Sequence, residues 1–323
     1  MTKISPLSVP PTDAEADTWW AVQTAAHATD AAGLPALPAP SRLEAAGRLR
    51  VPPQRGRLAR WTAGDGDGQA ALLLFTERGN THTAFLDELT VRPDARRRGV
   101  GTALWQRVHR ELLDQGRTSV TTVTDLGGPG QAFAEALGFE NVLTMGWYVR
   151  ELGQDGPPPL PATPGYELHV WPGLVPDAWA PATAVAHGAM EDAPSGDSEE
   201  TFQPWTAERV RGAQRLVLDR GGEITVVAAV TPAGEVAAYT VLVLPDPRGP
   251  RALQYDTVVV PAHRGHGLGR AVKLRMEVYA AEHLPGLRRI GTTVADENTP
   301  MRAVNESLGY HRERGAGLFQ FRL

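Results

Sequence analysis

The segment Leu89–Leu104 reads LTVRPDARRRGVGTAL, and the segment Thr257–Val272 reads TVVVPAHRGHGLGRAV. They align without a gap, and identical residues fall in register: Val91 on Val259, Pro93 on Pro261, Arg96 on Arg264, Gly99 on Gly267 and Gly101 on Gly269. The step from Arg96 to Arg264 is 168 residues, about half of the 323-residue chain. A repeat at this spacing predicts two copies of one domain.

The repeat extends beyond the aligned motif. Upstream, strands are expected at residues 57–63, 69–76 and 82–91 in the first copy and at 223–230, 235–245 and 252–260 in the second. Downstream come a helix with an apolar stripe, an apolar β-type run (119–123; 289–294), a short helix and a Leu-Gly-aromatic triplet (137–139; 308–310). This order predicts an α/β fold with a mixed α+β sheet in each of two tandem domains.

A stretch rich in proline and glycine separates the two copies. It reads GQDGPPPLPATPG over residues 153–165, and its prolines favour an extended linker. We therefore expect an N-terminal domain over residues 1–152, a linker over 153–165 and a C-terminal domain over 166–323.

Composition excludes several classes of function. The net charge of −5 and the pI near 6.0 argue against a nucleic-acid partner. The chain has no cysteine, which excludes disulfides, cysteine-ligated zinc and a cysteine nucleophile. The first twenty residues lack the apolar run of a signal peptide, and the apolar window 225–244 is broken by Pro232 and Gly234. We expect a soluble, cytoplasmic protein with no membrane partner; the sequence leaves its oligomeric state open.

The repeated motif Arg-x-x-Gly-x-Gly joins a strand to a helix. Its glycines let the backbone approach a ligand, and the first turn of the helix offers unpaired N–H groups that attract an anion. A pyrophosphate is the expected ligand. The predicted contacts are Arg96, Arg97, Arg98, Gly99, Val100, Gly101 and Thr102 in the first copy, and Arg264, Gly265, His266, Gly267, Leu268, Gly269 and Arg270 in the second.

Two other phosphate-binding motifs do not fit. A P-loop would end in Gly-Lys-Ser or Gly-Lys-Thr, which neither copy contains. The Rossmann fingerprint needs a further glycine and an acidic residue about 20 positions on, within a βαβ unit, and neither copy supplies this pattern.

With this motif on a strand-to-helix turn, the chain resembles the GNAT superfamily of N-acetyltransferases, and its tandem layout is similar to that of two-domain members such as mycothiol synthase. The resemblance is best over residues 82–150 and 250–323. It implies acetyl-CoA as the cofactor and an amine as the acceptor. His263 and His266 have no third ligand at suitable spacing, so no metal is expected. The same resemblance implies that Asn298 and Asn305, in the last helix of the second copy, border the cofactor. The first copy has LGGPGQAF over residues 126–133 at this place, without asparagine, which favours the second domain as the active one.

The resemblance also implies a mechanism of direct transfer, in which a neutral amine attacks the thioester. The superfamily often takes its base from the strand before the motif, where Glu88 and Asp256 are equivalent candidates. Side chains alternate along a strand, so a register shift by one would bring Asp87 or Tyr255 to the cleft instead. Backbone N–H groups near Val91 and Val259 are the expected oxyanion donors.

The chain departs from the superfamily at the general acid. Many members have a tyrosine three residues before the Leu-Gly-aromatic triplet, where this chain has Ala134 and Asn305. An amide is not acidic at neutral pH, so Tyr310 or bulk water is the candidate proton donor.

Three functions follow as hypotheses. The first is transfer of an acetyl group to a small-molecule primary amine; the acidic stretch 191–200 would suit a cationic amine, or is a solvated loop. The second is a non-catalytic acetyl-CoA-binding sensor or scaffold, which the missing tyrosines favour. The third is a protein lysine acetyltransferase.

Overall fold

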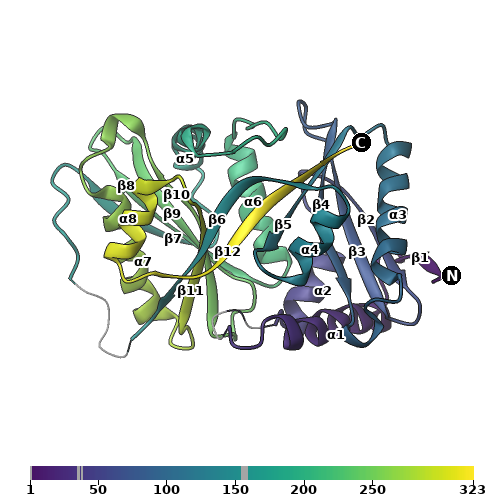
Figure 1. Ribbon diagram of the computed structural model, residues 1–323. Helices are drawn as coiled ribbons and strands as arrows, with labels where there is room; N and C mark the ends of the chain where they lie inside the picture. The colour runs from purple at the N-terminus through teal and green to yellow at the C-terminus, as the bar shows by residue number, and fades with distance from the viewer. Residues whose placement is uncertain (1, 35–36, 38, 154–158) are drawn as a thin grey trace. The chain divides into compact units, whose positions relative to one another are not determined.

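The computed structural model describes residues 2–34, 37, 39–153 and 159–323, and the chain forms two compact units (Figure 1). The first unit comprises Met1–Met145, Ser195–Gln203 and Arg314–Leu323; the second comprises Gly146–Pro194 and Pro204–Glu313. Part of the expected linker, residues 154–158, lies outside the described residues.

The first unit is a mixed sheet with helices against it. Its elements are β1 (Ile4–Pro6), α1 (Asp13–Asp30), α2 (Arg42–Arg50), β2 (Gly56–Ala63), β3 (Gly68–Phe75), β4 (Thr83–Val91), η1 (Pro93–Ala95), α3 (Val100–Asp114), β5 (Ser119–Asp125), α4 (Pro129–Ala136) and the first half of β6 (Glu140–Glu151). The strand order is β1-β2-β3-β4-β5-β12-β6, in which β4 and β5 are parallel and β1 to β4 form an antiparallel meander.

The second unit repeats this arrangement. Its elements are the second half of β6, β7 (Glu167–Pro172), α5 (Ala180–His187), η2 (Gly188–Asp192), α6 (Ala207–Asp219), β8 (Glu223–Val230), β9 (Val236–Leu244), β10 (Arg251–Val259), η3 (Pro261–His263), α7 (Leu268–His283), β11 (Arg289–Ala295), α8 (Thr299–Ser307) and the start of β12 (His311–Arg322). The strand order is β6-β11-β10-β9-β8-β7, with β10 and β11 parallel. The predicted α/β class and the six predicted meander strands are confirmed to within about two residues at their ends.

The last strands of the two copies are exchanged. β12, at the end of the chain, pairs with β5 of the first unit from Ala316 opposite Asp125 to Arg322 opposite Ser119. The second half of β6 belongs to the second unit, where β6 neighbours β11. The compact units therefore differ from the contiguous ranges 1–152 and 166–323, because each copy completes its sheet with the strand that ends the other copy.

A short excursion, Ser195–Gln203, also belongs to the first unit. Asn80, which is fully buried, accepts hydrogen bonds from the backbone N–H (2.8 Å) and hydroxyl (3.0 Å) of Thr201 and donates one to its carbonyl (3.0 Å). Glu199 pairs with Arg322, and Glu200 pairs with Arg55. These glutamates of the acidic stretch thus bind arginines of the chain itself, which argues against the reading that they serve a cationic amine.

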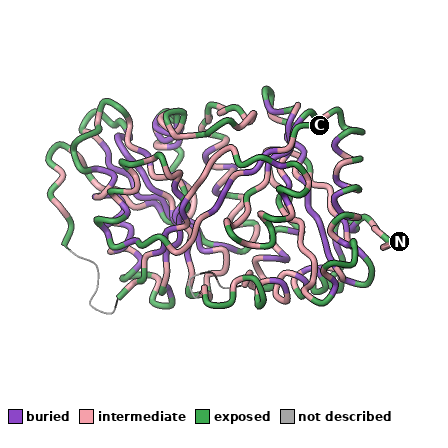
Figure 2. The backbone as a smooth tube through the Cα atoms, in the orientation of Figure 1, coloured by how far each residue is buried: buried purple, intermediate pink, exposed green. Residues whose placement is uncertain are grey.

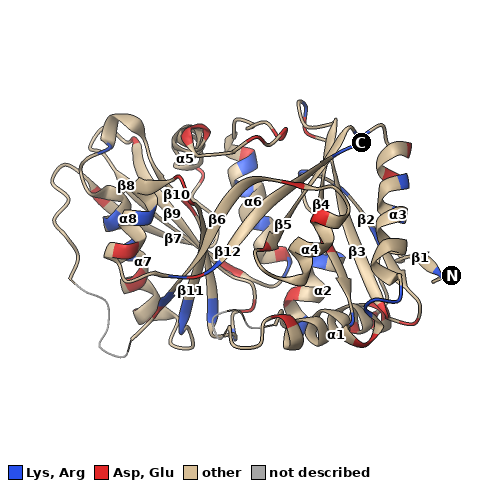
Figure 3. Cartoon of the chain, viewed as in Figure 1, with Lys and Arg blue, Asp and Glu red and all other residues tan. Residues whose placement is uncertain are grey.

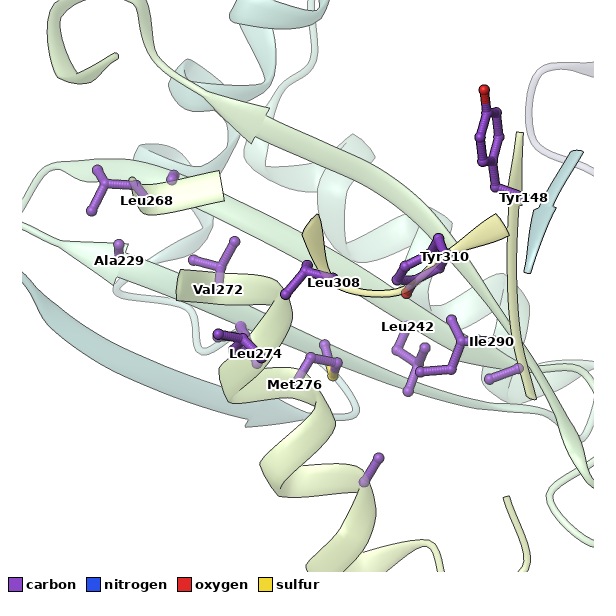
Figure 4. Close-up of a cluster of buried hydrophobic side chains, with 14 of the residues drawn as sticks. Tyr148, Ala229, Leu242, Leu268, Val272, Leu274, Met276, Ile290, Leu308 and Tyr310 are labelled. Carbon is purple, nitrogen blue, oxygen red and sulfur yellow. The ribbon is translucent and has the colours of Figure 1, made fainter. Parts of the chain in front are cut away.

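The cores follow the predicted stripes. Val100, Leu104, Val108 and Leu112 of α3 are buried against the first sheet, and Leu268, Val272 and Met276 of α7 against the second (Figure 2). Figure 4 shows Met276 of α7 beside Leu242 and Ile290 of the sheet, and Leu268 at the other end of the cluster near Ala229. The central strands β3 and β9 carry no charged residue (Figure 3), as expected for strands covered on both faces. Within the described part of the chain, every helix is too short or too polar to span a bilayer.

Candidate active site

Each sheet opens at the same place. β4 and β5 pair only from Thr83–Phe85 with Ser119–Thr121, and β10 and β11 only from Arg251–Leu253 with Arg289–Gly291. Beyond these residues the parallel strands diverge, and in the first unit a cavity of about 250 Å³ lies in the gap. It is lined by Leu86, Asp87, Glu88, Leu89 and Thr90 of β4, by Thr122, Val123 and Thr124 of β5, and by Gly130, Phe133, Ala134, Leu137 and Phe139.

A β-bulge lies at the point of divergence in both units. In the first unit Leu72 is opposite Leu86 and Ala71 is opposite Glu88, so Asp87 is the extra residue. In the second unit the register shifts between Gln254 and Thr257, at the aligned positions. A bulge turns the side chains that follow it, and here it directs the two predicted carboxylates, Glu88 and Asp256, toward the first helices of their units.

The neighbouring positions are placed elsewhere. Asp87 is held by Arg48 of α2 through two contacts of 2.8 and 2.9 Å, and Tyr255 is 53% exposed. The bulge thus turns Glu88 and Asp256 inward, toward the first helices of their units, whereas Asp87, at the edge of the cavity, is paired with Arg48 and Tyr255 is exposed.

Glu88 is a fully bonded carboxylate. It accepts hydrogen bonds from Trp19 (3.0 Å) and Gln23 (2.8 Å) of α1, from Gln69 of β3 (2.6 Å) and from Thr90 of β4 (3.0 Å). Burial raises the pKa of Glu88, and the hydrogen bonds from Gln69, Gln23 and Thr90 oppose this shift. A carboxylate whose lone pairs already accept four hydrogen bonds has little capacity left to take a proton from a substrate.

Asp256 has different surroundings. None of the described residues donates a hydrogen bond to its carboxylate, and Nδ1 of His187 lies 3.8 Å from Oδ2. His187 Nδ1 is instead 2.6 Å from the hydroxyl of Tyr239. Burial raises the pKa of Asp256 to about 6. Burial, with a smaller contribution from Arg209, lowers the pKa of His187 to about 4, so near neutral pH the imidazole is uncharged and the carboxylate is ionised.

The glycine turns are open, as an anion cradle requires. Gly99 (φ +82°) and Gly267 (φ +72°) are the N-caps of α3 and α7 in the left-handed conformation, which favours glycine. A Cβ built on Gly99, Gly265 or Gly267 would meet no atom within 4 Å, so a ligand can approach the backbone there. Gly101 is different, because its Cβ would lie 3.3 Å from Phe133 of α4. The turns therefore fit a pyrophosphate, and the prediction that they bind one remains a prediction.

Arg96 and Arg264, the first residues of the two motifs, bind groups of the protein itself. Arg96 donates to the carbonyl of Val91 (3.1 Å) and forms a two-pronged ion pair with Asp30 (2.7 and 2.6 Å). Arg264 repeats both contacts, with the carbonyl of Val259 (3.2 Å) and with Asp192 (2.7 Å). Their guanidinium groups are thus occupied by the protein, and their role in phosphate binding is indirect.

Other predicted contacts remain accessible. The side chains of Arg97, Arg98 and Arg270 form no hydrogen bond or ion pair with any described residue, so these are the cations available to a phosphate. Val100 and Leu268 bury their side chains, which leaves only their backbone N–H groups for a ligand. Thr102 and His266 are exposed, and His266 Nδ1 is 3.1 Å from the carbonyl of Arg264.

The strand N–H groups expected to bind an oxyanion point into the gap. The backbone N–H of Arg92 donates to Asp67, and that of Val260 donates to Ala237, each at 2.9 Å. Because hydrogen-bonded and non-hydrogen-bonded pairs alternate in an antiparallel ladder, the N–H groups of Val91 and Val259 face the opposite edge, toward the divergence.

The predicted residues in α8 and in the turn after it offer no free acidic proton. Asn298 is the N-cap of α8, and its side chain accepts from the N–H of Met301 (3.2 Å). Asn305 is fully buried and accepts from Lys273. Tyr310 is 3% exposed within the buried cluster of Figure 4, and its hydroxyl donates to Gln254 (2.6 Å). The prediction of Tyr310 as general acid therefore requires that a buried hydrogen bond breaks first.

Sequence reasoning missed His187 and Tyr239. Tyr239 lies opposite Val258 in its ladder, and Gln69 lies opposite Thr90, the residue aligned with Val258. Extending the alignment of the two copies upstream would therefore have placed Tyr239 at the position of Gln69. His187 ends α5, where the sequences of the two copies share no motif.

Comparison with known proteins identifies the class. The model of the acetyltransferase (GNAT) family matches residues 37–139 and 185–310, which together exceed half of the chain. The chain belongs to the GNAT acetyltransferase family, in which it is a tandem member with two α/β units.

Individual relatives agree with this placement. A mycothiol acetyltransferase from Catenulispora acidiphila is 28% identical over 263 residues, which cover 76% of this chain and 75% of that protein. The structure of a tandem GNAT protein from the clavulanic acid biosynthesis pathway, free of acetyl-CoA, is similar with a TM-score of 0.82 at 28% identity and covers 100% of this chain and 98% of that one. A GCN5-related N-acetyltransferase from Sphaerobacter thermophilus shares the fold, with a TM-score of 0.71 at 18% identity over 99% of this chain and 95% of that one.

Proposed function

We propose that the chain moves an acetyl group from acetyl-CoA to a primary amine of a small molecule, and that the second unit performs the transfer. The single observation that carries the choice of unit is the contrast between the two inward carboxylates. Glu88 accepts hydrogen bonds from Trp19, Gln23, Gln69 and Thr90, whereas Asp256 accepts none from the described residues.

The roles of this chain's residues follow from their positions. Acetyl-CoA, when bound, supplies the thioester that the amine attacks. The turn Gly265–Arg270 would hold the pyrophosphate with its N–H groups and with Arg270. Asp256 would accept the proton of the acceptor ammonium, since a carboxyl with a pKa of about 6 is both ionised and basic enough near neutral pH. The N–H of Val259 would stabilise negative charge on the carbonyl oxygen.

Water is the proposed source of the proton for the departing thiolate. Tyr310 donates to Gln254, and Asn305 accepts from Lys273, so neither predicted residue offers a free acidic proton. A thiolate is a stable leaving group whose protonation by solvent is undemanding at neutral pH. The identity of the amine stays open in this proposal, and a cytoplasmic location remains a prediction.

A thiol-release assay over a panel of amines, with mass analysis of the products, tests the proposal. Asp256→Asn should lower kcat by about 10²- to 10⁴-fold, because the amide cannot accept the proton. The matched variant Glu88→Gln, at the aligned position of the first unit, should lower kcat by less than about tenfold. A large loss in Glu88→Gln with little loss in Asp256→Asn would move the active site to the first unit.

A second candidate function is acyl-CoA binding without transfer. The bonded states of Tyr310 and Asn305 favour it, since no described side chain at these positions can protonate a leaving group. Calorimetric binding of acetyl-CoA combined with no turnover on any amine in the panel, including lysine side chains of added proteins, would select this function over transfer.

A further inference from the structure

The surroundings of Asp256 are built from two residues on separate elements. Tyr239 of β9 is 3% exposed and His187 at the end of α5 is 5% exposed. The imidazole of His187 lies 3.9 Å from the ring of Trp205, centroid to centroid, at an interplanar angle of 31°. The plane of the imidazole is thereby fixed, so the direction in which Nδ1 points is a property of the fold.

Nδ1 of His187 is close to both Tyr239 and Asp256, and it forms its hydrogen bond with Tyr239. The phenol oxygen is 2.6 Å away, well within hydrogen-bond distance, whereas Asp256 Oδ2 at 3.8 Å is beyond it. A phenol is the better donor and a neutral imidazole nitrogen the better acceptor, so we assign the proton of this bond to Tyr239 and the ring proton to Nε2. No N–H is then directed at the carboxylate.

In the first unit, hydrogen-bond donors occupy the positions that correspond to Tyr239 and His187. Gln69 stands at the ladder position of Tyr239, and Gln23 comes from the helix that corresponds to α5. Both amides donate to Glu88, at 2.6 and 2.8 Å. One fold therefore presents a carboxylate in two states, bonded in the first unit and without a donor in the second.

We propose that Tyr239 and His187 are positioning residues for Asp256: the phenol captures the imidazole nitrogen, so that the carboxylate stays without a donor and free to take the proton of the acceptor amine. This inference rests on the proposed function, in which Asp256 is the base. It adds that the strength of the base is set by the bond between Tyr239 and His187.

Charged groups also lie on the elements packed against β10. These elements carry Glu191 and Asp192 on η2, Arg270, Lys273, Arg275, Glu277, Glu282 and His283 on α7, and Arg289 on β11. Asp192 pairs with Arg264, Glu277 with Arg150, and Arg289 with Glu151, while Lys273 donates to Asn305; Glu191 is exposed. The guanidinium carbon of Arg209 of α6 lies 5.4 Å from the centre of the Trp205 ring, and its charge contributes to the lowered pKa of His187.

The test compares three variants by the pH dependence of kcat/KM. Tyr239→Phe frees Nδ1, which can then carry the ring proton and donate it in a hydrogen bond to Asp256; the acid limb should move down by about one pH unit. His187→Gln introduces an amide donor, as Gln23 provides in the first unit, and should move the limb in the same direction. His187→Phe offers no donor, so the limb should stay in place or move up.

A second readout does not depend on turnover. Titration of the Asp256 carboxyl by ¹³C NMR, assigned with Asp256→Asn, should show the same order of shifts in the three variants. The matched control is Tyr166→Phe, which removes another Tyr–His bond of this unit (3.0 Å to His263) and should leave the titration of Asp256 unchanged.

These measurements separate two failures. If no amine is acetylated while the carboxyl titrates in the predicted order, the proposed function is wrong and the positioning role stands. If Tyr239→Phe and His187→Phe shift Asp256 in the same direction, or neither shifts it in a protein that circular dichroism shows to be folded, the positioning role is overturned.

Discussion

Lys273 Nζ donates a hydrogen bond of 2.5 Å to Oδ1 of Asn305 inside the second unit, where both side chains are at most 2% exposed. The ammonium also lies 4.3 Å from the centre of the Tyr310 ring. At the aligned positions the first unit has Trp105 and Ala134, which pack in an apolar cluster with Phe139. Burial lowers the pKa of Lys273 to about 7, which reflects the cost of charge in this core.

We expect Asn305→Ala to destabilise the protein by about 2 kcal/mol, because it leaves the lysine without its acceptor. The double variant Lys273→Met with Asn305→Ala should lie within about 1 kcal/mol of wild type, since both polar groups are then gone. Urea denaturation at pH 7 gives the free energies of unfolding. Additive losses in the double variant would show that the two side chains act independently.

The ion pair of Arg264 with Asp192 predicts equal effects for its two members. Arg264→Ala and Asp192→Ala should each raise KM for acetyl-CoA about threefold, a small effect because both groups are half exposed. The double variant should be no worse than either single variant. A much larger effect of Arg264→Ala than of Asp192→Ala would mean that the guanidinium contacts phosphate directly. Arg96→Ala, the counterpart in the first unit, is the control.

The raised pKa of Asp256 predicts that Asp256→Asn, which replaces the carboxyl with a neutral amide, stabilises the protein by an amount that depends on pH. In the folded protein the carboxyl of Asp256 stays protonated up to about pH 6, whereas its ordinary pKa is 3.8. Its contribution to stability is therefore fully present below pH 3.8 and is lost as pH rises through 6. The advantage of Asp256→Asn over wild type should therefore grow by about 1–2 kcal/mol from pH 4 to 7.5, allowing for a side chain that is 32% exposed. Thermal unfolding at the two pH values measures it, and an advantage that does not change with pH would contradict the prediction.

Local sequence patterns were sufficient to predict most of the fold. The glycines of both turns and the apolar stripe of α3 determine structure within a few residues, so they could be interpreted from the sequence alone. The exchange of β6 and β12 could not, because both strands follow the same Leu-Gly-aromatic triplet and nothing in either strand specifies its partner. Strand pairing depends on distant residues, and an exchange leaves the local sequence unchanged.

The site shows the same division. Glu88 and Asp256 were found because the repeat aligns them, but their opposite bonding states depend on α1 and α5, where the copies differ. Arg96 and Arg264 were expected to contact phosphate because of their charge and their place in the motif. The carboxylates that pair with them, Asp30 and Asp192, lie 66 and 72 residues away in sequence. A sequence motif does not identify partners that come close only in the folded structure.

The most direct test of the second unit as the site of transfer is the turnover of two matched variants, Gly99→Val and Gly267→Val. Both place a branched side chain on an open, left-handed glycine at the N-cap of the motif helix, so any general strain should be similar. Gly267→Val should lower kcat/KM for acetyl-CoA by about 100-fold or more, and Gly99→Val by less than about threefold. Equal losses, or a loss confined to Gly99→Val, would contradict the account.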